Sequence, residues 1–329
     1  MGDVQIDIVG DVHGNLAPLK MLLAALGYDE RDQWRHPSGR RLLFVGDLVD
    51  RGPASFEVAE LVRSLCEGGE HLCLLGNHEL NLVDWRRGRT GPKHSNRKTI
   101  AAIEADAERG GWAAILDFFE TLPVAVELPD LRVTHAVWHQ GCFDQLLPAL
   151  QRPVAGHLRS SFWRDVVRLH SPFEGGKLRD GLPTAPFPGQ WENALQVFLK
   201  GYESKAPVPF VDNDGVTRDQ VRTEWWKPAY TEVPRDRRTV FGHYWNMPPI
   251  EALHESLVPP HPSGHPELRR WTGEHHARVA SAGTRAVGAS ERAICVDYNG
   301  VTKEGARACV GAYRYPEAEV VWRAAPVTR

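Results

Sequence analysis

The chain has 329 residues, of which 42% are hydrophobic and 25% charged, and its formal net charge is −3 at pH 7. This composition is ordinary for a globular protein with a sizeable core, and the small negative charge argues against non-specific binding along nucleic acid, which needs a basic excess. The five cysteines are an odd number without CxxC spacing, which disfavours a disulfide framework and a zinc ribbon. The first residues hold no basic segment ahead of an apolar stretch, and no run of 18 apolar residues occurs. We therefore expect a cytoplasmic protein with no membrane partner.

Strand-like and helix-like segments alternate over the first 135 residues, which is typical of an α/β sheet. Short apolar runs predict strands at residues 4–9, 42–45, 71–75, 124–128 and 131–134. Leucines at helical spacing predict a helix over 16–26 that Asn15 caps and Gly27 ends. A second helix is expected to begin at Pro53, because proline suits the first position of a helix.

The middle of the chain, from 143 to 237, interrupts this pattern. It is rich in tryptophan, proline and charge, and predicts helices separated by irregular connections. Strand-like segments resume at 239–241, 293–296, 309–313 and 320–322. We interpret residues 1–329 as a single domain with 143–237 as an inserted, mainly helical cap. The stretch 259–288, rich in His, Arg, Gly and Ser, is interpreted as a long surface loop.

Three of the early strands are each followed by a glycine-led turn that carries acidic, amide or imidazole side chains. The turns are Gly10-Asp11-Val12-His13-Gly14, Gly46-Asp47-Leu48-Val49-Asp50-Arg51-Gly52 and Gly76-Asn77-His78-Glu79. In an open α/β sheet, ligands bind beyond the carboxyl ends of the strands, so the three turns should meet there. The side chains brought to that point would be Asp11, His13, Asp47, Asp50, Asn77 and His78.

These candidate ligands are oxygens and imidazoles without a thiolate, a set that suits Mn, Fe or Zn. Two further candidates, His135 and His243, each follow a later predicted strand. The set is too large for one tetrahedral ion and fits two ions that share a carboxylate, for which Asp47 is the natural bridge. A single aspartate after a strand is more often a helix cap, and a single histidine more often a packed residue. The ordered repetition of three turns favours a metal site.

The three turns, in this order, resemble the signature of the calcineurin-like metallophosphoesterases. They are most similar to the branch that holds the phosphoprotein phosphatases and the symmetrical diadenosine tetraphosphatases. The match covers about the first 140 residues, together with Phe241-Gly242-His243 and the last strands. The resemblance implies a β-sandwich flanked by helices, with a site at one end of the sheets that holds two divalent ions. Manganese is the preferred ion, with iron and zinc also suitable.

The resemblance also implies a role for each site residue. One ion would be held by Asp11, His13 and Asp47, and the second by Asp47, Asn77, His135 and His243. His78 would be the general acid that protonates the leaving oxygen, and Asp50 would hold it in place. Arg51 would bind the phosphate oxygens, with Asn77 also in contact with the substrate. A water activated between the two ions would attack directly, without a covalent phosphoenzyme.

Two departures from the family pattern leave two assignments open. His135 is followed by Ala136-Val137-Trp138 where the branch usually has two glycines, so His139 stays as a less favoured candidate for the same ligand. The protein phosphatases use a second phosphate-binding arginine in the region that corresponds to the cap. Its candidates here are Arg235, Arg237 and Arg238.

Two further clusters bear on the substrate. The segment 85–98 carries Arg86, Arg87, Arg89, Lys93, Arg97 and Lys98. It is either a receptor for the extra phosphates of a nucleotide chain or a solvated basic loop. A second cluster consists of Trp225, Trp226 and Tyr230, which would either stack on a base or pack the cap.

We predict a metal-dependent hydrolase of phosphoanhydride or phosphomonoester bonds that resembles the dinucleoside tetraphosphatases. A Ser/Thr protein phosphatase is the alternative, and a phosphodiesterase or a non-catalytic metal- or nucleotide-binding protein is less favoured. The expected partner is a small, nucleotide-like phosphorylated substrate or a phosphoprotein. The basic segment is too local to serve as a nucleic-acid track.

Overall fold

The fold is described from a computed structural model of the protein. The described residues are 4–153, 158–175, 177–179, 182, 193–211, 217–223, 225, 234–244, 293–298 and 307–326. The predicted loop at 259–288 lies outside them, as do Trp226 and Tyr230. In the part of the chain that the structure describes, no helix is long and apolar enough to cross a bilayer.

The first of two five-stranded sheets has the strand order β14-β13-β1-β2-β3. Strands β1 (Ile6–Val9), β2 (Arg41–Phe44) and β3 (Leu72–Cys73) run parallel to one another. The hairpin of β13 (Arg307–Tyr315) and β14 (Glu319–Pro326) pairs antiparallel with the other edge of β1. The end of the chain therefore completes the sheet that the beginning starts.

The second sheet has the strand order β12-β11-β5-β4-β6. Strands β5 (Leu131–Thr134), β11 (Arg238–Phe241) and β12 (Ala293–Cys295) are parallel. Strands β4 (Ala125–Glu127) and β6 (Val167–Leu169) extend the sheet antiparallel. All the strands predicted from the sequence are present, within a few residues at their ends.

A hydrophobic layer joins the two sheets. Ile6 and Ile8 of β1 are fully buried and belong to one cluster with Val133 of β5, Val240 of β11 and Ile294 of β12. The alternation of side chains along each strand turns these apolar residues towards the facing sheet. The predicted β-sandwich flanked by helices is therefore confirmed.

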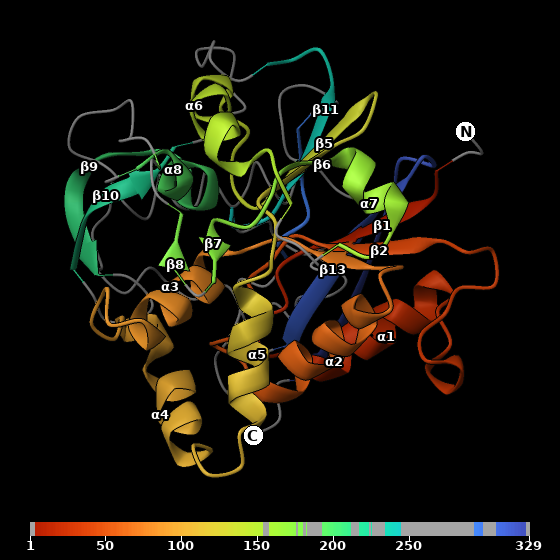
Figure 1. The fold of residues 1–329 in the computed structure, drawn as a ribbon, viewed down its shortest axis with the longest axis horizontal. Helices are drawn as coiled ribbons and strands as arrows, with labels where there is room; N and C mark the ends of the chain where they lie inside the picture. The colour runs from red at the N-terminus through yellow and green to blue at the C-terminus, as the bar shows by residue number, and fades with distance from the viewer. Residues whose placement is uncertain are drawn as a thin grey trace.

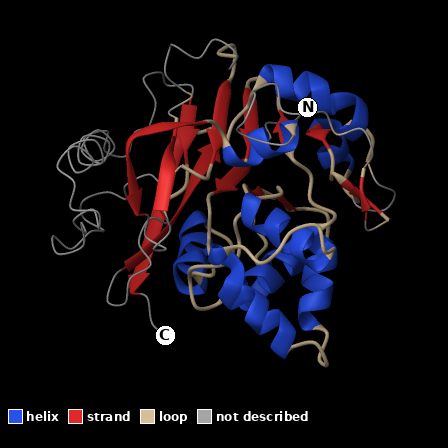
Figure 2. Ribbon diagram, turned by 90° about the vertical axis from the view of Figure 1, so that its left-hand side faces the viewer, coloured by secondary structure: helices blue, strands red, loops and turns tan. Residues whose placement is uncertain are grey.

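Helices cover the outer faces of the sandwich, and Figure 2 shows the strands together with helices in two groups. Helices α1 (Leu16–Leu26) and α2 (Ser55–Glu67) pack on strands of the first sheet, and α5 (Gly111–Phe119) packs against α2 (Figure 1). Helix α3 (Asn77–Arg86) directly follows β3, and the short helix η2 (His94–Asn96) leads into α4 (Arg97–Ala105). A further short helix, η1 (Glu30–Asp32), follows α1.

The middle of the chain holds strands as well as helices, whereas mainly helices were predicted. Its helices are α6 (Gln140–Leu150), α7 (Ser161–Val166) and α8 (Ala194–Lys200). Its strands, besides β6, are β7 (Phe173–Glu174), β8 (Lys177–Leu178), β9 (Glu203–Val211) and β10 (Thr217–Arg222). Strands β9 and β10 form an antiparallel hairpin outside the two main sheets, at the left of Figure 1.

Two local predictions differ from the structure. Helix α2 begins at Ser55, two residues after Pro53, because residues 50–52 are still part of the turn. Asn15 precedes α1 but accepts no capping hydrogen bond; its side-chain amide instead donates to the carbonyls of Val12 and His13. Asn15 thus stabilises the turn before the helix rather than the helix end.

Candidate metal centre

The three glycine-led turns lie against one another at the carboxyl ends of β1, β2 and β3. The backbone N–H groups of Val12 and His13 both donate to the carbonyl of Asp47, at 3.1 and 2.9 Å. The Glu79 carboxylate, on the first turn of α3, accepts from the backbone N–H groups of Asp47, Leu48 and Gly76 at 2.8, 2.8 and 3.1 Å. Backbone hydrogen bonds therefore fix the first turn to the second, and one buried carboxylate fixes the second to the third.

Glycine is required at one point where two of these turns approach each other and at one point where the segment after β11 approaches the first turn. A Cβ atom on Gly76 would lie 2.3 Å from the backbone nitrogen of Asp47, and one on Gly242 would lie 2.0 Å from Oδ1 of Asp11. Both distances are far inside van der Waals contact, so any side chain at either position would displace a candidate ligand.

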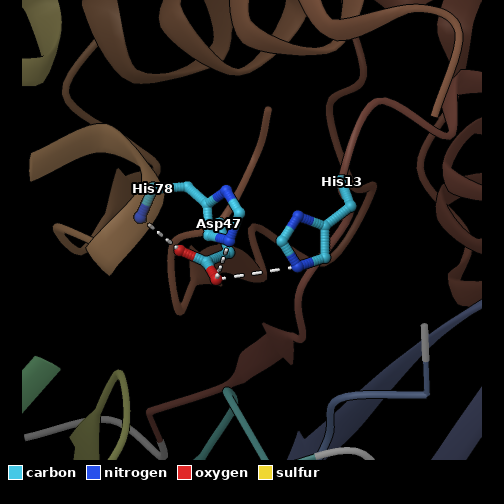
Figure 3. Close-up of side chains that lie close together, drawn as sticks. All are labelled: His13, Asp47 and His78. Atoms are coloured by element: carbon cyan, nitrogen blue, oxygen red, sulfur yellow. Dashed lines mark hydrogen bonds and ion pairs between the residues drawn. The ribbon is translucent and has the colours of Figure 1, made fainter. Parts of the chain in front are cut away.

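A first group of candidate ligands surrounds one oxygen of Asp47. Oδ2 of Asp47 lies 3.6 Å from Nε2 of His13 and 3.9 Å from Nε2 of His78. Figure 3 shows both imidazole rings directed at this carboxylate. Nε2 of His13 also lies 3.9 Å from Oδ2 of Asp11. All four side chains are buried.

A second group surrounds the other oxygen of Asp47. Nε2 of His135 lies 3.5 Å from Oδ1 of Asp47 and 3.1 Å from Oδ1 of Asn77. The ring of His243 is 5.3 Å from that of His135, and Asp47, His135 and His243 bring ligand atoms within 4.8 Å of one another. Asp47 is common to both groups, so its two oxygens face two separate sets of ligands.

The histidines are arranged to offer a lone pair rather than a proton to this cluster. Nδ1 of His13 lies 2.8 Å from the carbonyl of Val49, and Nδ1 of His135 lies 2.8 Å from that of Val45. A carbonyl only accepts, so each Nδ1 carries a proton. Burial lowers the pKa of both rings, so each ring is neutral and its Nε2 keeps a lone pair. Among the described residues, the buried Nε2 of His13 has no hydrogen-bond partner. A metal ion would satisfy it, and such backbone contacts are what usually orient metal-bound histidines.

The electrostatics of the cluster also fit a cation. Burial, Asp297 and Asp47 raise the pKa of Asp11 well above its usual range. Burial, helped by Arg51, holds the pKa of His13 well below its usual range, so that this ring is neutral. Burial and Asp47 raise the pKa of Glu79 to about 7. Several carboxyl groups thus share a buried site with neutral imidazoles, and bound divalent ions would compensate their charge.

His78 differs from the other imidazoles in its partner. Its Nδ1 lies 2.5 Å from Oδ2 of Asp50, and its backbone N–H donates to Oδ1 of Asp47. Burial lowers the pKa of His78, but Asp47 and the bond to Asp50 outweigh it and raise the pKa above its ordinary value. His78 is therefore the imidazole of the cluster that most readily holds a proton on both ring nitrogens.

Strained backbone is concentrated at the site. Eight non-glycine residues have a positive φ among those that the structure describes. Five of the eight belong to the predicted site: His13, Asp47, Asp50, Arg51 and His243. Left-handed backbone is unfavourable for such residues and persists where surrounding contacts impose it, which is common at functional sites.

Two residues of the site were not predicted. Asp297 follows β12 and is fully buried, and it raises the pKa of Asp11 more than Asp47 does. Its signal was present, because it stands two residues beyond a strand, as Asp11 does. Arg222, at the end of β10, donates from Nη1 to the carbonyl of His243, and burial and Arg51 lower its pKa. Nothing in the local sequence distinguishes Arg222 from the other arginines of the cap.

The three arginines considered as a second phosphate ligand lie elsewhere. Arg238 is the first residue of β11, and Arg235 and Arg237 precede it, so all three lie at the end of β11 opposite to His243. Arg237 pairs with Glu127 at 2.8 Å. Arg222, by contrast, reaches the site from the cap.

His139 and Trp225 both have structural roles. Nδ1 of His139 accepts from the backbone N–H of Cys142 at the start of α6, so His139 caps a helix, whereas His135 lies beside Asp47. Trp225 is buried against Phe241 and donates to the carbonyl of Ala136. It therefore packs the cap and is not available to stack on a base.

Half of the six basic residues of segment 85–98 are paired with acids. Arg86 pairs with Asp117, Arg87 with Glu120 and Arg89 with Asp84, each at 2.7 Å. Lys93, Arg97 and Lys98 are exposed, and Arg97 and Lys98 lie on α4 rather than in a loop. These contacts favour a solvated surface over a receptor for additional phosphates.

The sequence is similar to those of several bis(5'-nucleosyl)-tetraphosphatases. A bis(5'-nucleosyl)-tetraphosphatase of the asymmetrical type, PrpE of Halalkalibacterium halodurans, is 39% identical over 140 residues, which are 40% of this chain and 57% of the relative. A symmetrical bis(5'-nucleosyl)-tetraphosphatase of Ralstonia nicotianae is 31% identical over 165 residues, 48% of this chain and 51% of the relative. The matches thus span little more than half the length of these relatives.

A protein serine/threonine phosphatase from Saccharomyces cerevisiae aligns over 99% of this chain and 81% of its own, at 16% identity and a TM-score of 0.49. The model of the calcineurin-like phosphoesterase family matches residues 4–244, which include every predicted ligand from Asp11 to His243. The chain therefore belongs to the calcineurin-like phosphoesterase family.

Proposed function

We propose that the chain is a metal-dependent phosphohydrolase, similar to the dinucleoside tetraphosphatases, that cleaves a phosphoanhydride bond with two divalent ions. The observation that carries this proposal is the double cluster around Asp47, in which each carboxylate oxygen faces its own set of histidines. Asp11, His13 and Asp47 would hold one ion, and Asp47, Asn77, His135 and His243 the other. Manganese is the preferred ion, with iron and zinc also suitable.

When bound, the two ions would supply a water nucleophile at neutral pH and neutralise charge on the phosphoryl oxygens. The protein must still protonate the leaving oxygen. His78 is suited to this because Asp50 holds its Nδ1, which leaves Nε2 facing the ligand cluster. A raised pKa keeps the proton available near neutral pH.

Arg51 and Arg222 would hold the phosphate oxygens. Each lowers the pKa of a site histidine through its charge, Arg51 that of His13 and Arg222 that of His243. Two guanidinium groups beside a buried cluster form a site for an anion with several oxygens. Arg222 is the last residue of β10. We therefore propose that residues 143–237 act as a cap and that its hairpin of β9 and β10 completes the phosphate site.

The preference for a dinucleotide is supported by the names of the two bis(5'-nucleosyl)-tetraphosphatases above. A Ser/Thr protein phosphatase is the alternative. The test is to remove metal with a chelator, restore Mn²⁺, Fe²⁺ or Zn²⁺ separately, and compare kcat/KM for diadenosine tetraphosphate, 4-nitrophenyl phosphate and a phosphothreonine peptide.

We expect metal-dependent turnover with the highest kcat/KM for diadenosine tetraphosphate. Product analysis then identifies the bond, because cleavage at the centre yields two ADP and cleavage off-centre yields ATP and AMP. Preference for the peptide would establish the protein phosphatase function instead. Two bound ions per chain with no turnover of any of the three would contradict the proposal.

A further inference from the structure

Asn96 and Thr99 are buried polar residues in an otherwise exposed polar segment. Asn96 ends η2 and Thr99 lies on the first turn of α4, and they are 1% and 4% exposed, whereas Lys93, Arg97 and Lys98 are exposed. A separation of three residues places Asn96 and Thr99 on one face of the helical turn. Burial of two polar side chains is costly unless each has a hydrogen-bond partner.

Their shared partner is Asp50. The Asn96 side-chain amide donates to Oδ2 of Asp50, and the Thr99 hydroxyl donates to Oδ1. Oδ2 is also the oxygen beside Nδ1 of His78. Residues of η2 and α4 thus bind both oxygens of Asp50. These two hydrogen bonds fix the plane of the carboxylate and its rotation about χ2.

Asp50 needs such support because the bonds of its backbone leave the rotation of its carboxylate unfixed. Its φ is +69°, in the left-handed region, and its backbone N–H donates to the hydroxyl of Ser55. A carboxylate free to rotate about χ2 would offer His78 a variable acceptor direction, and Nε2 of His78 would move with it. Small displacements of a proton donor reduce its efficiency strongly, since proton transfer requires hydrogen-bond reach of the leaving oxygen.

We propose that Asn96 and Thr99 are positioning residues that orient Asp50 and, through it, the proton on Nε2 of His78. This inference rests on the proposed phosphohydrolase function. It gives segment 94–99 a role different from the one considered for its basic residues: its buried polar side chains act on the leaving group through Asp50.

The test uses the full chain loaded with Mn²⁺ and two esters that differ in leaving group. The leaving group of 4-nitrophenyl phosphate departs with little protonation, whereas that of phenyl phosphate is more basic and depends on an acid. For Asn96→Ala and Thr99→Val we expect kcat on phenyl phosphate to fall about 10-fold and kcat on 4-nitrophenyl phosphate less than about 3-fold, with KM unchanged. Thr99→Ser, which keeps the hydroxyl, should retain the parent kcat.

Three controls separate positioning from general damage. Ile100→Ala empties a core position on the same helix and should lower thermal stability without changing the ratio of the two kcat values. Metal content by elemental analysis should stay at two ions per chain in every variant. In a His78→Asn background, Asn96→Ala should have no further effect on phenyl phosphate, because the acid is already absent.

Equal losses on both esters in Asn96→Ala and Thr99→Val, or the same change of ratio in Ile100→Ala, would overturn the positioning role while leaving the proposed function intact. Lack of hydrolysis of both esters and of diadenosine tetraphosphate by the unaltered protein with every ion would overturn the proposed function and this inference with it.

Discussion

At the scale of single residues, replacement of Arg222 tests whether the cap contributes to phosphate binding. It donates from Nη1 to the carbonyl of His243, a candidate ligand, and a guanidinium group is a donor suited to phosphate oxygens. Replacing Arg222 with alanine should lower kcat/KM for the preferred substrate by about 10- to 100-fold, the range expected for a lost charged hydrogen bond. Steady-state kinetics on the Mn²⁺-loaded protein measure this directly.

Arg218 supplies the matched control, since it is an exposed arginine on the same strand, β10. Arg218→Ala should leave kcat/KM near that of the parent. Metal content must be measured in both variants, because Arg222 also touches a ligand-bearing turn. A loss of bound metal in Arg222→Ala that accounted for the whole fall in activity would refute a direct role in phosphate binding.

The candidate ligands could be predicted from sequence because each follows a recognisable strand, and all but His135 also follow a glycine. Asp11, Asp47 and Asn77 were placed by that rule alone, and His135 by its position after a strand. The rule does not identify Arg222, which lies on a hairpin in a segment without a recognisable motif. Nor does it reach the contacts of the Asp50 carboxylate with Asn96 and Thr99, which lie far along the chain.

At the scale of elements, Glu79 holds α3 against the turn after β2. Its carboxylate accepts from three buried backbone N–H groups, those of Asp47, Leu48 and Gly76. In Glu79→Gln one oxygen becomes an amide that itself donates, so at least one N–H loses its acceptor. We expect the free energy of unfolding to fall by about 1–3 kcal/mol, the cost of an unsatisfied buried donor.

This loss is measured by urea unfolding of the metal-free protein, so that metal binding does not contribute. The variant should also bind Mn²⁺ more weakly, because the turn that carries Asp47 is released. Glu57→Gln is the control, an exposed acid in the first turn of α2 that should change neither quantity by a measurable amount. Unchanged stability and metal affinity in Glu79→Gln would show that α3 is held by packing alone.

Several elements were not predicted, for reasons that differ among them. Helix α4 is short and buries only Thr99 and Ile100, one of them a polar residue that contacts the site, so its sequence lacks a clear apolar stripe. Helix α5 buries Trp112, Ile115, Leu116 and Phe119 at helical spacing, and this stripe was overlooked in the sequence. In the cap, the hairpin of β9 and β10 lies outside both sheets and carries exposed charged residues, so no alternation of buried and polar residues marked it.

At the scale of the whole molecule, the first sheet combines strands from the two ends of the chain. Asp7 of β1 is fully buried and accepts from Tyr28, from Arg40 and from Arg314 of β13. Arg40 also pairs with Glu317, in the turn between β13 and β14. An acid within an apolar strand gives no indication of a partner that lies at the other end of the chain. Such pairing follows from the tertiary fold and is invisible to local periodicity.

The global stability of the folded chain should depend on pH through histidines that lie far from the metal cluster. His71 is 5% exposed and its Nδ1 accepts from the backbone N–H of Leu42, so the ring is neutral in the fold. Burial, together with Arg41, lowers the pKa of His71 to about 4. In the unfolded chain the same ring titrates near about 6.5.

Between these two values the unfolded state binds more protons than the folded state, so the free energy of unfolding falls as pH decreases from about 6.5 to about 4. For His71 the loss reaches about 2 kcal/mol at about pH 5, relative to about pH 7.5.

His71→Asn keeps an acceptor for the Leu42 N–H and removes the titration. Urea unfolding of both metal-free proteins at these two pH values should therefore show a smaller loss of stability in the variant. Other titrating groups are shared by the two proteins and cancel in the comparison. Parallel losses in parent and variant would mean that His71 takes up its proton without cost in the folded state, contrary to what its burial predicts.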